Sequence, residues 1–263
     1  MAPTDNRPTF DEIVAKLRTT AGGEFEVREI GSVTYPERSY PIIRISRPEP
    51  LLDRPTVCII AGFHGEEPAG PTAIHEHIDE ILRIVHEKKL NLVLFPCANS
   101  WGYDRSVRHP PGAEATNSFT HNPKGVARES EIIKTDLERF AVDYYLDLHE
   151  DDENNGAYIY AFGNRDLSKR ILGALTRHVP LESNPKMDDP TIMDADICDG
   201  IVWNAHDGSS EDWISHRGAK LSICTETPSS FFPLPVRTAA QMAAIREIFV
   251  IAGRPQGVNS TKD

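Results

Sequence analysis

The chain has 263 residues, of which 39% are hydrophobic and 26% charged, and its formal net charge is -12 at pH 7. This composition is typical of a globular enzyme with one large α/β core and excludes a disordered or fibrous chain. An acidic chain argues against a nucleic-acid partner, which would require basic clusters. No stretch reaches the roughly 18 apolar residues of a spanning helix, and residues 1–14 lack a signal-peptide pattern. We therefore expect no membrane partner and a cytoplasmic location, whereas the oligomeric state stays open.

Strand-like and helix-like segments alternate along the chain. An amphipathic helix is predicted at 10–20, and alternating apolar residues at 24–33 and 40–46 predict two strands. Continuous apolar runs predict strands that are buried on both faces. These predicted strands are 55–62, 90–99, 142–150, 157–163 and 221–227, and the helices between and after them are 68–89, 129–140, 166–179, 209–218 and 236–253. Segments 99–128 and 180–200 are predicted to be irregular, and a loop as long as the first is usually functional.

This order of elements predicts the fold class. Strands that alternate with helices favour an α/β domain of three layers, α/β/α, in which helices cover both faces of a mixed, largely parallel central sheet. We expect residues 1–263 to form a single catalytic domain of this kind. Ligands of such sheets bind beyond the carboxyl ends of the strands, so polar side chains at those ends are candidate site residues.

His64 and Glu67 come directly after the predicted strand 55–62 and are followed by Pro68. Because they are three residues apart, one tight turn can present both side chains to the same point. An isolated His-x-x-Glu pattern also arises by chance on solvated loops. Its position at a strand end favours a metal site.

Asp147 and His149 lie at the end of a second predicted strand, 142–150. Alternate residues of a strand point to the same face, and a carboxylate beside a metal-bound histidine commonly orients its ring. The alternative is a solvated strand end that leads into the acidic residues 150–153. This pair alone therefore does not decide between the two.

Glu226 ends a third predicted strand, and the combination of the three strand ends is informative. Together they supply His64, Glu67 and His149 and then one further carboxylate. Two histidines and one glutamate form the protein ligand set of a catalytic zinc site, which keeps a fourth position for water. We therefore predict a Zn²⁺ ion on the first three side chains, with Glu226 as the base that takes a proton from an activated water.

The motifs and their order resemble the zinc carboxypeptidase family, which includes the succinylglutamate desuccinylase/aspartoacylase deacylases and the murein-peptide amidases. The segment GFHGEEPAG at 62–70 is similar to the first metal segment of the family. Further residues match the segments before the second histidine and before the catalytic glutamate: Asn99, Gly102, Arg108, Asp212, Trp213 and Gly218. The resemblance covers roughly residues 55–252 and implies the fold and the metal ligands given above.

The resemblance also implies substrate contacts. Arg108 would polarise the scissile carbonyl and stabilise the oxyanion. Asn117 falls where carboxypeptidases have an Asn-Arg pair for the terminal carboxylate, but the arginine is missing. An ungapped count back from Glu226 puts Asn204 at the position of a tyrosine near the substrate, and Glu211 at the specificity position. A carboxylate at the bottom of the pocket favours a basic group, although Glu211 would equally fit the surface of a short helix.

These features predict a zinc-dependent metallohydrolase that cleaves an amide bond, of the carboxypeptidase or peptide amidase type, acting on a small peptide or acyl-amino acid. Because the usual arginine is missing, Arg105, Arg128 or His121 would bind the substrate carboxylate instead. One alternative is an N-acyl amino acid deacylase of the aspartoacylase type. The other is a non-catalytic zinc-binding domain on the same fold, against which the presence of both Arg108 and Glu226 argues.

Overall fold

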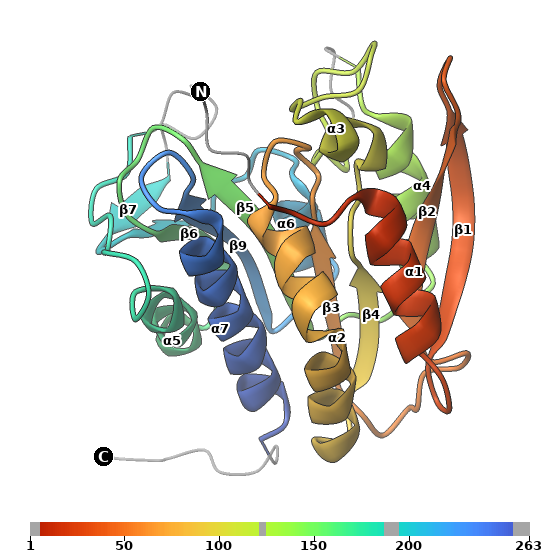
Figure 1. Cartoon of the computed structure of the whole chain (residues 1–263). Helices are drawn as coiled ribbons and strands as arrows, with labels where there is room; N and C mark the ends of the chain where they lie inside the picture. Colours follow the sequence, from red (N-terminus) through yellow and green to blue (C-terminus); the bar gives the residue numbers. More distant parts are fainter. Residues whose placement is uncertain (1–5, 121–124, 187–194, 255–263) are drawn as a thin grey trace.

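The computed structural model describes residues 6–120, 125–186 and 195–254, and its centre is a nine-stranded sheet (Figure 1). The strands lie in the order β1-β2-β4-β3-β5-β9-β6-β8-β7. In chain order they are β1 (Glu26–Thr34), β2 (Ser39–Ser46), β3 (Thr56–Ala61), β4 (Asn91–Phe95), β5 (Tyr144–Asp151), β6 (Tyr158–Gly163), β7 (Asp196–Cys198), β8 (Ile201–Trp203) and β9 (Leu221–Pro228).

The central strands β4, β3, β5 and β9 are parallel, whereas β1, β2, β6 and β7 each pair antiparallel with a neighbour. The parallel strands are buried on both faces, as their continuous apolar runs predict. The predicted fold class, a mixed and largely parallel sheet between helices, is confirmed.

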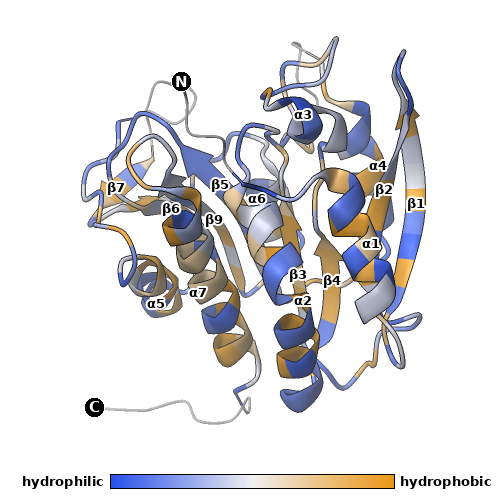
Figure 2. Ribbon diagram, in the orientation of Figure 1, coloured by the Kyte–Doolittle hydropathy of each residue, from blue (hydrophilic) through white to orange (hydrophobic). Residues whose placement is uncertain are grey.

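Helices cover both faces of this sheet (Figure 1). One face carries α1 (Phe10–Thr20), α2 (Ala69–Glu87), α5 (Arg165–Leu175) and α7 (Leu234–Ala252), whose apolar side chains form one core with Val57, Ile59 and Leu146. The other carries α4 (Arg128–Leu137) and α6 (Ser210–His216), which pack over Cys58, Ile60 and neighbouring residues. Figure 2 shows hydrophobic residues toward the sheet and hydrophilic residues on the outer sides of α1 and α2.

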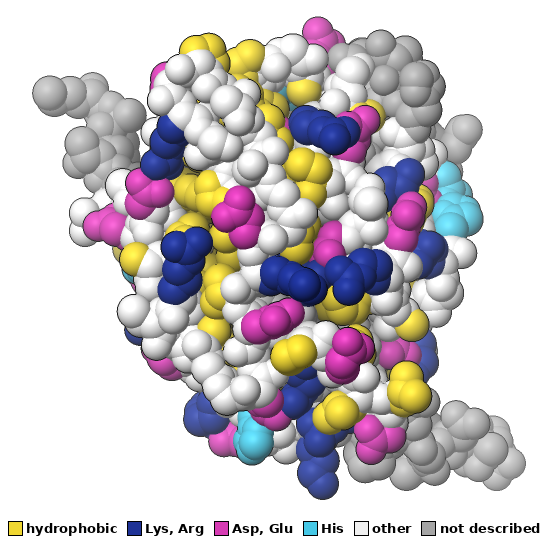
Figure 3. Space-filling view, turned by 90° about the vertical axis from the view of Figure 1, so that its right-hand side faces the viewer, with side chains coloured by type: hydrophobic (Ala, Val, Ile, Leu, Met, Phe, Trp, Pro, Cys, Tyr) yellow, Lys and Arg dark blue, Asp and Glu magenta, His cyan; other side chains and the backbone are white. Residues whose placement is uncertain are grey.

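The outer strand β1 carries charged, exposed side chains such as Arg28 and Glu29. Figure 3 views the molecule from this side and shows basic and acidic side chains interspersed over the surface. Charges on an outer strand oppose pairing with another sheet edge. Among the described helices, none is long and apolar enough to cross a membrane.

Three short elements differ from the sequence prediction. The helix α3 (Ser100–Arg105) lies inside the segment 99–128, and the strands β7 and β8 lie at 196–203. The helix α3 has only six residues, too few to show a helical period, and Asn99 starts it by accepting a hydrogen bond from the Gly102 N–H at 2.9 Å. β7 and β8 have three residues each, so alternation could not identify them. The remaining predicted helices and strands are present, with shifts of a few residues at their ends.

Candidate metal centre

The turn after β3 places His64 and Glu67, and glycines make the turn possible. Gly62 has a φ of 70°, in the left-handed region that favours glycine. A Cβ on Gly65 would come within 2.0 Å of the carbonyl carbon of Gly102 in α3, so only glycine fits there. The backbone N–H of Glu67 donates to the His64 carbonyl at 3.3 Å. This close approach of turn and helix fixes both side chains at the carboxyl end of the sheet.

His149 comes from the neighbouring strand β5 and meets the two side chains of the turn. The Nδ1 atom of His64 lies 2.6 Å from Oε1 of Glu67 and 3.1 Å from Nδ1 of His149. The His149 Nδ1 atom in turn lies 2.9 Å from Oε2 of Glu67. These separations approach the roughly 3.4 Å between neighbouring ligand atoms of a tetrahedral site with bonds of about 2.1 Å. The structure therefore brings together the three side chains that the sequence proposed as ligands.

All three side chains are buried, and burial acts together with their neighbours' charges to shift each pKa. Burial lowers the pKa of His64 to about 4, although Glu67 opposes the shift. Burial also disfavours a charged His149, but the carboxylates of Asp147 and Glu67 outweigh this effect and raise its pKa. For Glu67, the two histidines outweigh burial and lower its pKa. An ionised Glu67 and a neutral His64 are the forms that bind a metal.

Asp147 lies behind His149 on the same face of β5, as the strand period predicts. Its Oδ2 atom is 3.3 Å from Nε2 of His149 and accepts a hydrogen bond from the Ser210 hydroxyl at 2.7 Å. The Tyr145 hydroxyl donates to Ser210 at 2.8 Å. A buried chain of polar side chains from β5 and α6 thus fixes the carboxylate against which the His149 ring lies.

Four further contacts support the cluster and were not apparent in the sequence. The Glu150 N–H donates to Oε2 of Glu67 at 3.1 Å, and the Glu150 side chain forms a buried ion pair with Arg237 of α7. The Glu150 carboxylate also accepts from the N–H of Ala69 at 2.8 Å, at the positive end of α2. Gln241 donates to the His149 carbonyl at 2.7 Å. These contacts join residues up to 92 positions apart, and no local pattern marks such pairs.

Glu226 lies beside this cluster on β9. The strand register pairs it directly with His149 of β5 and with Tyr158 of β6. Burial raises the pKa of Glu226 well above its ordinary value, and the negative charge of Glu67 adds to the shift, while His149 and Arg108 oppose it. Its Oε2 atom is buried and has no hydrogen-bond partner within the described part of the chain. A partly buried carboxylate with one buried oxygen, beside a candidate metal centre, is well suited to receive a proton.

Arg108 and His109 approach the cluster from the loop after α3. One guanidinium nitrogen of Arg108 lies 2.9 Å from Glu66 and 3.0 Å from Glu67, while 51% of the side chain stays exposed. The His109 ring lies nearly perpendicular to the His64 ring at a centroid distance of 5.7 Å, and the sequence did not point to this residue. Its position next to Arg108 was the available signal. Arg108 is therefore placed near the cluster with one side open to solvent.

Glu211, on α6, is buried, so its alternative placement on the helix surface is wrong. Its Oε2 atom lies 3.3 Å from the Ser210 hydroxyl, which also contacts Asp147, and the Ser222 hydroxyl donates to its carbonyl at 2.7 Å. Burial, together with the charges of Asp207 and Asp147, raises the pKa of Glu211 to about 8. The side chain therefore lies between α6 and the sheet, on the face that carries Asp147.

Asn117 and Asn204 occupy different surroundings. Asn117 is half-buried, and the adjoining Ser118 pairs with Ser209 at the start of α6. Asn204 is exposed, has a φ of 54°, and follows β8, which β6 separates from β9. Because β8 runs opposite to β9, Asn204 lies toward the other end of the sheet from Glu226. The ungapped count from Glu226 therefore misplaced Asn204.

Of the three side chains suggested for a substrate carboxylate, the two that the structure describes pair with residues outside the cluster. Arg105 bonds Tyr40 at 2.8 Å and pairs with Glu37 at 3.2 Å, beside β2. Arg128 pairs with Glu131 at 2.7 Å on α4. His121 lies outside the described residues. Arg105 and Arg128 are thus occupied elsewhere, which corrects that expectation.

The cluster fits a zinc ion by its chemistry. Its two imidazole nitrogens and one carboxylate oxygen all lie within 4.8 Å of one another, and each residue is buried. The donors match the two-histidine, one-glutamate set of catalytic zinc sites. The Glu226 Oε2 atom, which has no hydrogen-bond partner among residues 6–120, 125–186 and 195–254, fits a site that also holds water.

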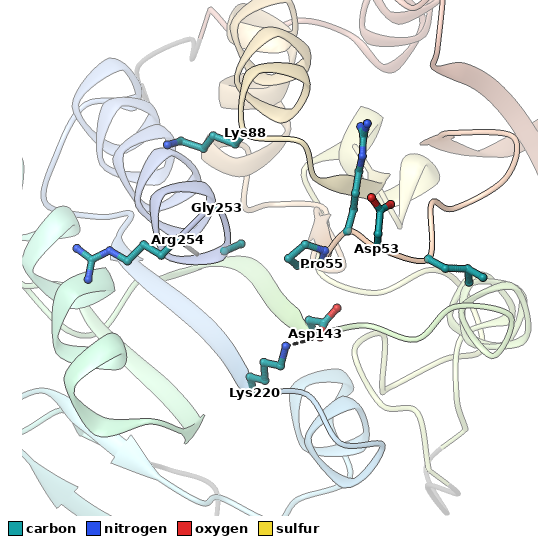
Figure 4. A pocket seen from close by; sticks show the side chains of 10 residues that line it. Asp53, Pro55, Lys88, Asp143, Lys220, Gly253 and Arg254 are labelled. Carbon is teal, nitrogen blue, oxygen red and sulfur yellow. Dashed lines mark ion pairs between the residues drawn. The ribbon is translucent and has the colours of Figure 1, made fainter. Parts of the chain in front are cut away.

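A separate pocket of about 520 Å³ lies at the amino ends of the central strands (Figure 4). Its walls include Pro55, Asp143 and Lys220, which directly precede β3, β5 and β9, and the last two form an ion pair of 2.9 Å. The pocket contains no residue of the candidate metal centre, which lies beyond the other ends of the same strands.

Solved structures share the whole architecture. A predicted metallopeptidase of Shewanella baltica superposes with a TM-score of 0.78 at 23% identity, over 92% of this chain and 91% of that one. A second one, from Shewanella denitrificans, has a TM-score of 0.76 at 23% identity, over 93% of this chain and 89% of that one. A metallo-carboxypeptidase of Burkholderia cenocepacia has a TM-score of 0.67 at 14% identity, over 93% of this chain and 69% of that one. The fold is therefore that of the metallo-carboxypeptidases.

The sequence identifies the family. Residues 53–185, slightly more than half of the chain, match the succinylglutamate desuccinylase/aspartoacylase catalytic domain. The chain belongs to this family, which lies within the superfamily that the sequence motifs predicted. No curated protein sequence matches the chain.

Proposed function

We propose that the protein is a zinc-dependent hydrolase that cleaves an amide bond in a small substrate. The observation that carries the proposal is the meeting of His64, Glu67 and His149 at the carboxyl ends of β3 and β5, with Glu226 paired opposite His149. A metal-binding module would not need, beside its ligands, a carboxylate with a buried oxygen that lacks a hydrogen-bond partner among the described residues. The family match and the metallo-carboxypeptidase fold support the same assignment.

Each side chain has a distinct role in this proposal. His64, Glu67 and His149 would hold zinc, which supplies the Lewis acidity that lowers the pKa of a water molecule to about 7. Glu226 takes a proton from the attacking water and returns it to the leaving amine. Arg108, half exposed beside Glu67, binds the carbonyl oxygen as negative charge develops on it.

The substrate class follows from the remaining side chains. Glu211 is buried near the cluster, where its pKa is raised to about 8, and a cationic group beside it would stabilise its ionised form. It would therefore select a substrate with an amino or other cationic group. Asn117, on the loop that contacts the start of α6, would hold the leaving portion through its amide. A small peptide with a basic residue satisfies both contacts, and we propose it as the first substrate class.

The family match favours a second candidate, hydrolysis of an N-acyl amino acid. The same four residues would perform this reaction, and only the substrate contacts would differ. A screen of the zinc-loaded protein against basic peptides, neutral peptides, murein peptides and acyl-amino acids separates the two. Turnover of peptides alone supports the first candidate, and turnover of acyl-amino acids alone supports the second. Absence of turnover on every panel would contradict hydrolase action.

His149→Ala is expected to lose the buried zinc. Removing one of three protein ligands should lower affinity by at least the roughly tenfold that loss of an outer partner costs. Elemental analysis after exchange against a weak chelator should give about one zinc fewer per chain than the original protein. His178→Ala, on the exposed surface after α5, is the matched control and should keep its zinc. Full zinc in a folded His149→Ala protein would refute the ligand assignment.

Glu211→Gln is expected to impair turnover of basic substrates selectively. Loss of a charge-assisted hydrogen bond costs about 1.5–3 kcal/mol, so kcat/KM for a lysine- or diamino acid-containing peptide should fall by about 10- to 150-fold. A neutral peptide should be nearly unaffected. Glu76→Gln, an exposed change on α2 at the other face of the sheet, is the control. Equal losses for basic and neutral substrates would contradict charge selection by Glu211.

A further inference from the structure

A second group of metal-ligand side chains lies on the outer side of α6. The Asp212 Oδ1 atom is 2.8 Å from Nδ1 of His206 and 3.1 Å from Nδ1 of His216. The two imidazole centroids are 5.1 Å apart. One ligand atom from each of the three residues lies within 4.8 Å of the others.

The local structure fixes the carboxylate at the centre of this group. Only 9% of the Asp212 side chain is exposed, and its other oxygen accepts from the Gly208 N–H at 2.9 Å. The Asp212 N–H donates to the Ser209 hydroxyl, which begins the helix. His206 packs against the Phe162 ring at 5.3 Å, and the four-residue spacing brings His216 to the same side of α6 as Asp212. The ligand atoms are therefore held together without a metal.

We propose that His206, Asp212 and His216 form a second site, for a divalent transition-metal ion of which zinc is the first candidate. Two imidazole nitrogens and one carboxylate oxygen suit zinc, nickel and copper, whereas calcium and magnesium prefer oxygen ligands. Within the described part of the chain, no lysine or arginine forms an ion pair with Asp212.

The site differs from the buried centre in its access to water. The side chains of His206 and His216 are 58% and 65% exposed, whereas those of His64 and His149 are 7% and 2% exposed. Water would therefore fill the remaining coordination positions, and the ion should exchange readily. The second site is expected to bind more weakly than the first.

An ion at this site connects two segments near the proposed substrate region. It would tie the loop at His206 to α6, where Glu211 precedes Asp212 and points inward. The same loop accepts a hydrogen bond at Gly208 from the N–H of Phe119, at 3.0 Å, two residues after Asn117. Metal at the outer site would thus restrain the loop and the first turn of α6 together.

The experiment is a calorimetric titration of the zinc-loaded protein with Zn²⁺ after removal of loosely held ions. The original protein should take up about one further equivalent, and His206→Ala and His216→Ala should each weaken this uptake by about tenfold or more. His178→Ala is the matched surface control and should titrate like the original protein. Circular dichroism establishes that each variant is folded, and the exposure of both histidines makes retention of the fold the expected result.

A His149→Ala protein separates this inference from the proposed function. It should lose the tightly held zinc and still bind one equivalent at the outer site, whereas the double variant His149→Ala with His206→Ala should bind at neither. A second equivalent that persists in both single variants, His206→Ala and His216→Ala, would place the ion elsewhere and overturn the inference. Absence of any second equivalent in the original protein would overturn it as well, whatever the result for the buried centre.

Discussion

Glu226→Gln is expected to lower kcat by about 10²–10⁴-fold, the contribution typical of a positioned proton-transfer group. Glutamine keeps the shape of the side chain but cannot accept the proton of the attacking water. The reason lies in the geometry, since Glu226 is partly buried, pairs with His149 across β5 and β9, and has a buried oxygen with no hydrogen-bond partner in the described structure. Steady-state kinetics on the best substrate of the activity screen measures the effect.

Zinc content and stability decide how a loss of activity at this position is interpreted. Because Glu226 is not one of the three proposed ligands, the glutamine variant should retain its zinc. It should also be at least as stable as the original, since burial disfavours the charged carboxylate that the substitution removes. Unchanged turnover would exclude Glu226 as the base, and a loss of zinc together with turnover would assign it to the metal instead.

Arg108→Ala is expected to lower kcat by about 10²–10³-fold, as loss of one oxyanion donor does. The fold should tolerate the change, because a half-exposed ion pair contributes little to stability. The effect should fall mainly on kcat, since the guanidinium acts where charge develops in the transition state.

Two further variants sharpen this second result. Arg108→Lys keeps a cation without the planar fork, so its activity should lie between those of the original and the alanine variant. Arg83→Ala, on the exposed face of α2, removes an arginine side chain of similar exposure from a surface ion pair and should leave turnover unchanged. A tenfold or greater rise in KM for Arg108→Ala with unchanged kcat would assign the residue to ground-state binding.

The sequence was most informative where a physical pattern was strong. Continuous apolar runs predicted the buried strands β3, β4, β5 and β9, because a parallel strand covered on both faces has few polar positions. The helix α3 and the strands β7 and β8 were missed, because three to six residues do not define a period. Tertiary pairing, which a local pattern does not contain, decides whether such short segments form.

The candidate site was predicted in the same uneven way. His64, Glu67, His149 and Glu226 all end or follow strong strands, so their meeting follows from the sheet topology. The buried pair of Glu150 and Arg237 joins residues 87 positions apart, and no local signal marks it. Asn204 was misplaced because an ungapped count assumes that the segment between β8 and β9 has the same length and course as in the family. This segment contains α6 and the loop before it.

The most direct test of the account is anomalous X-ray scattering recorded on both sides of the zinc absorption edge from crystals of the zinc-loaded protein. We predict a peak among the Nδ1 atoms of His64 and His149 and the carboxylate of Glu67, within about 2.0–2.2 Å of each ligand. It should vanish in His149→Ala crystals and persist in Glu226→Gln crystals. Zinc-loaded crystals with no anomalous peak among these three side chains would contradict the proposed metal centre and the hydrolytic function built on it.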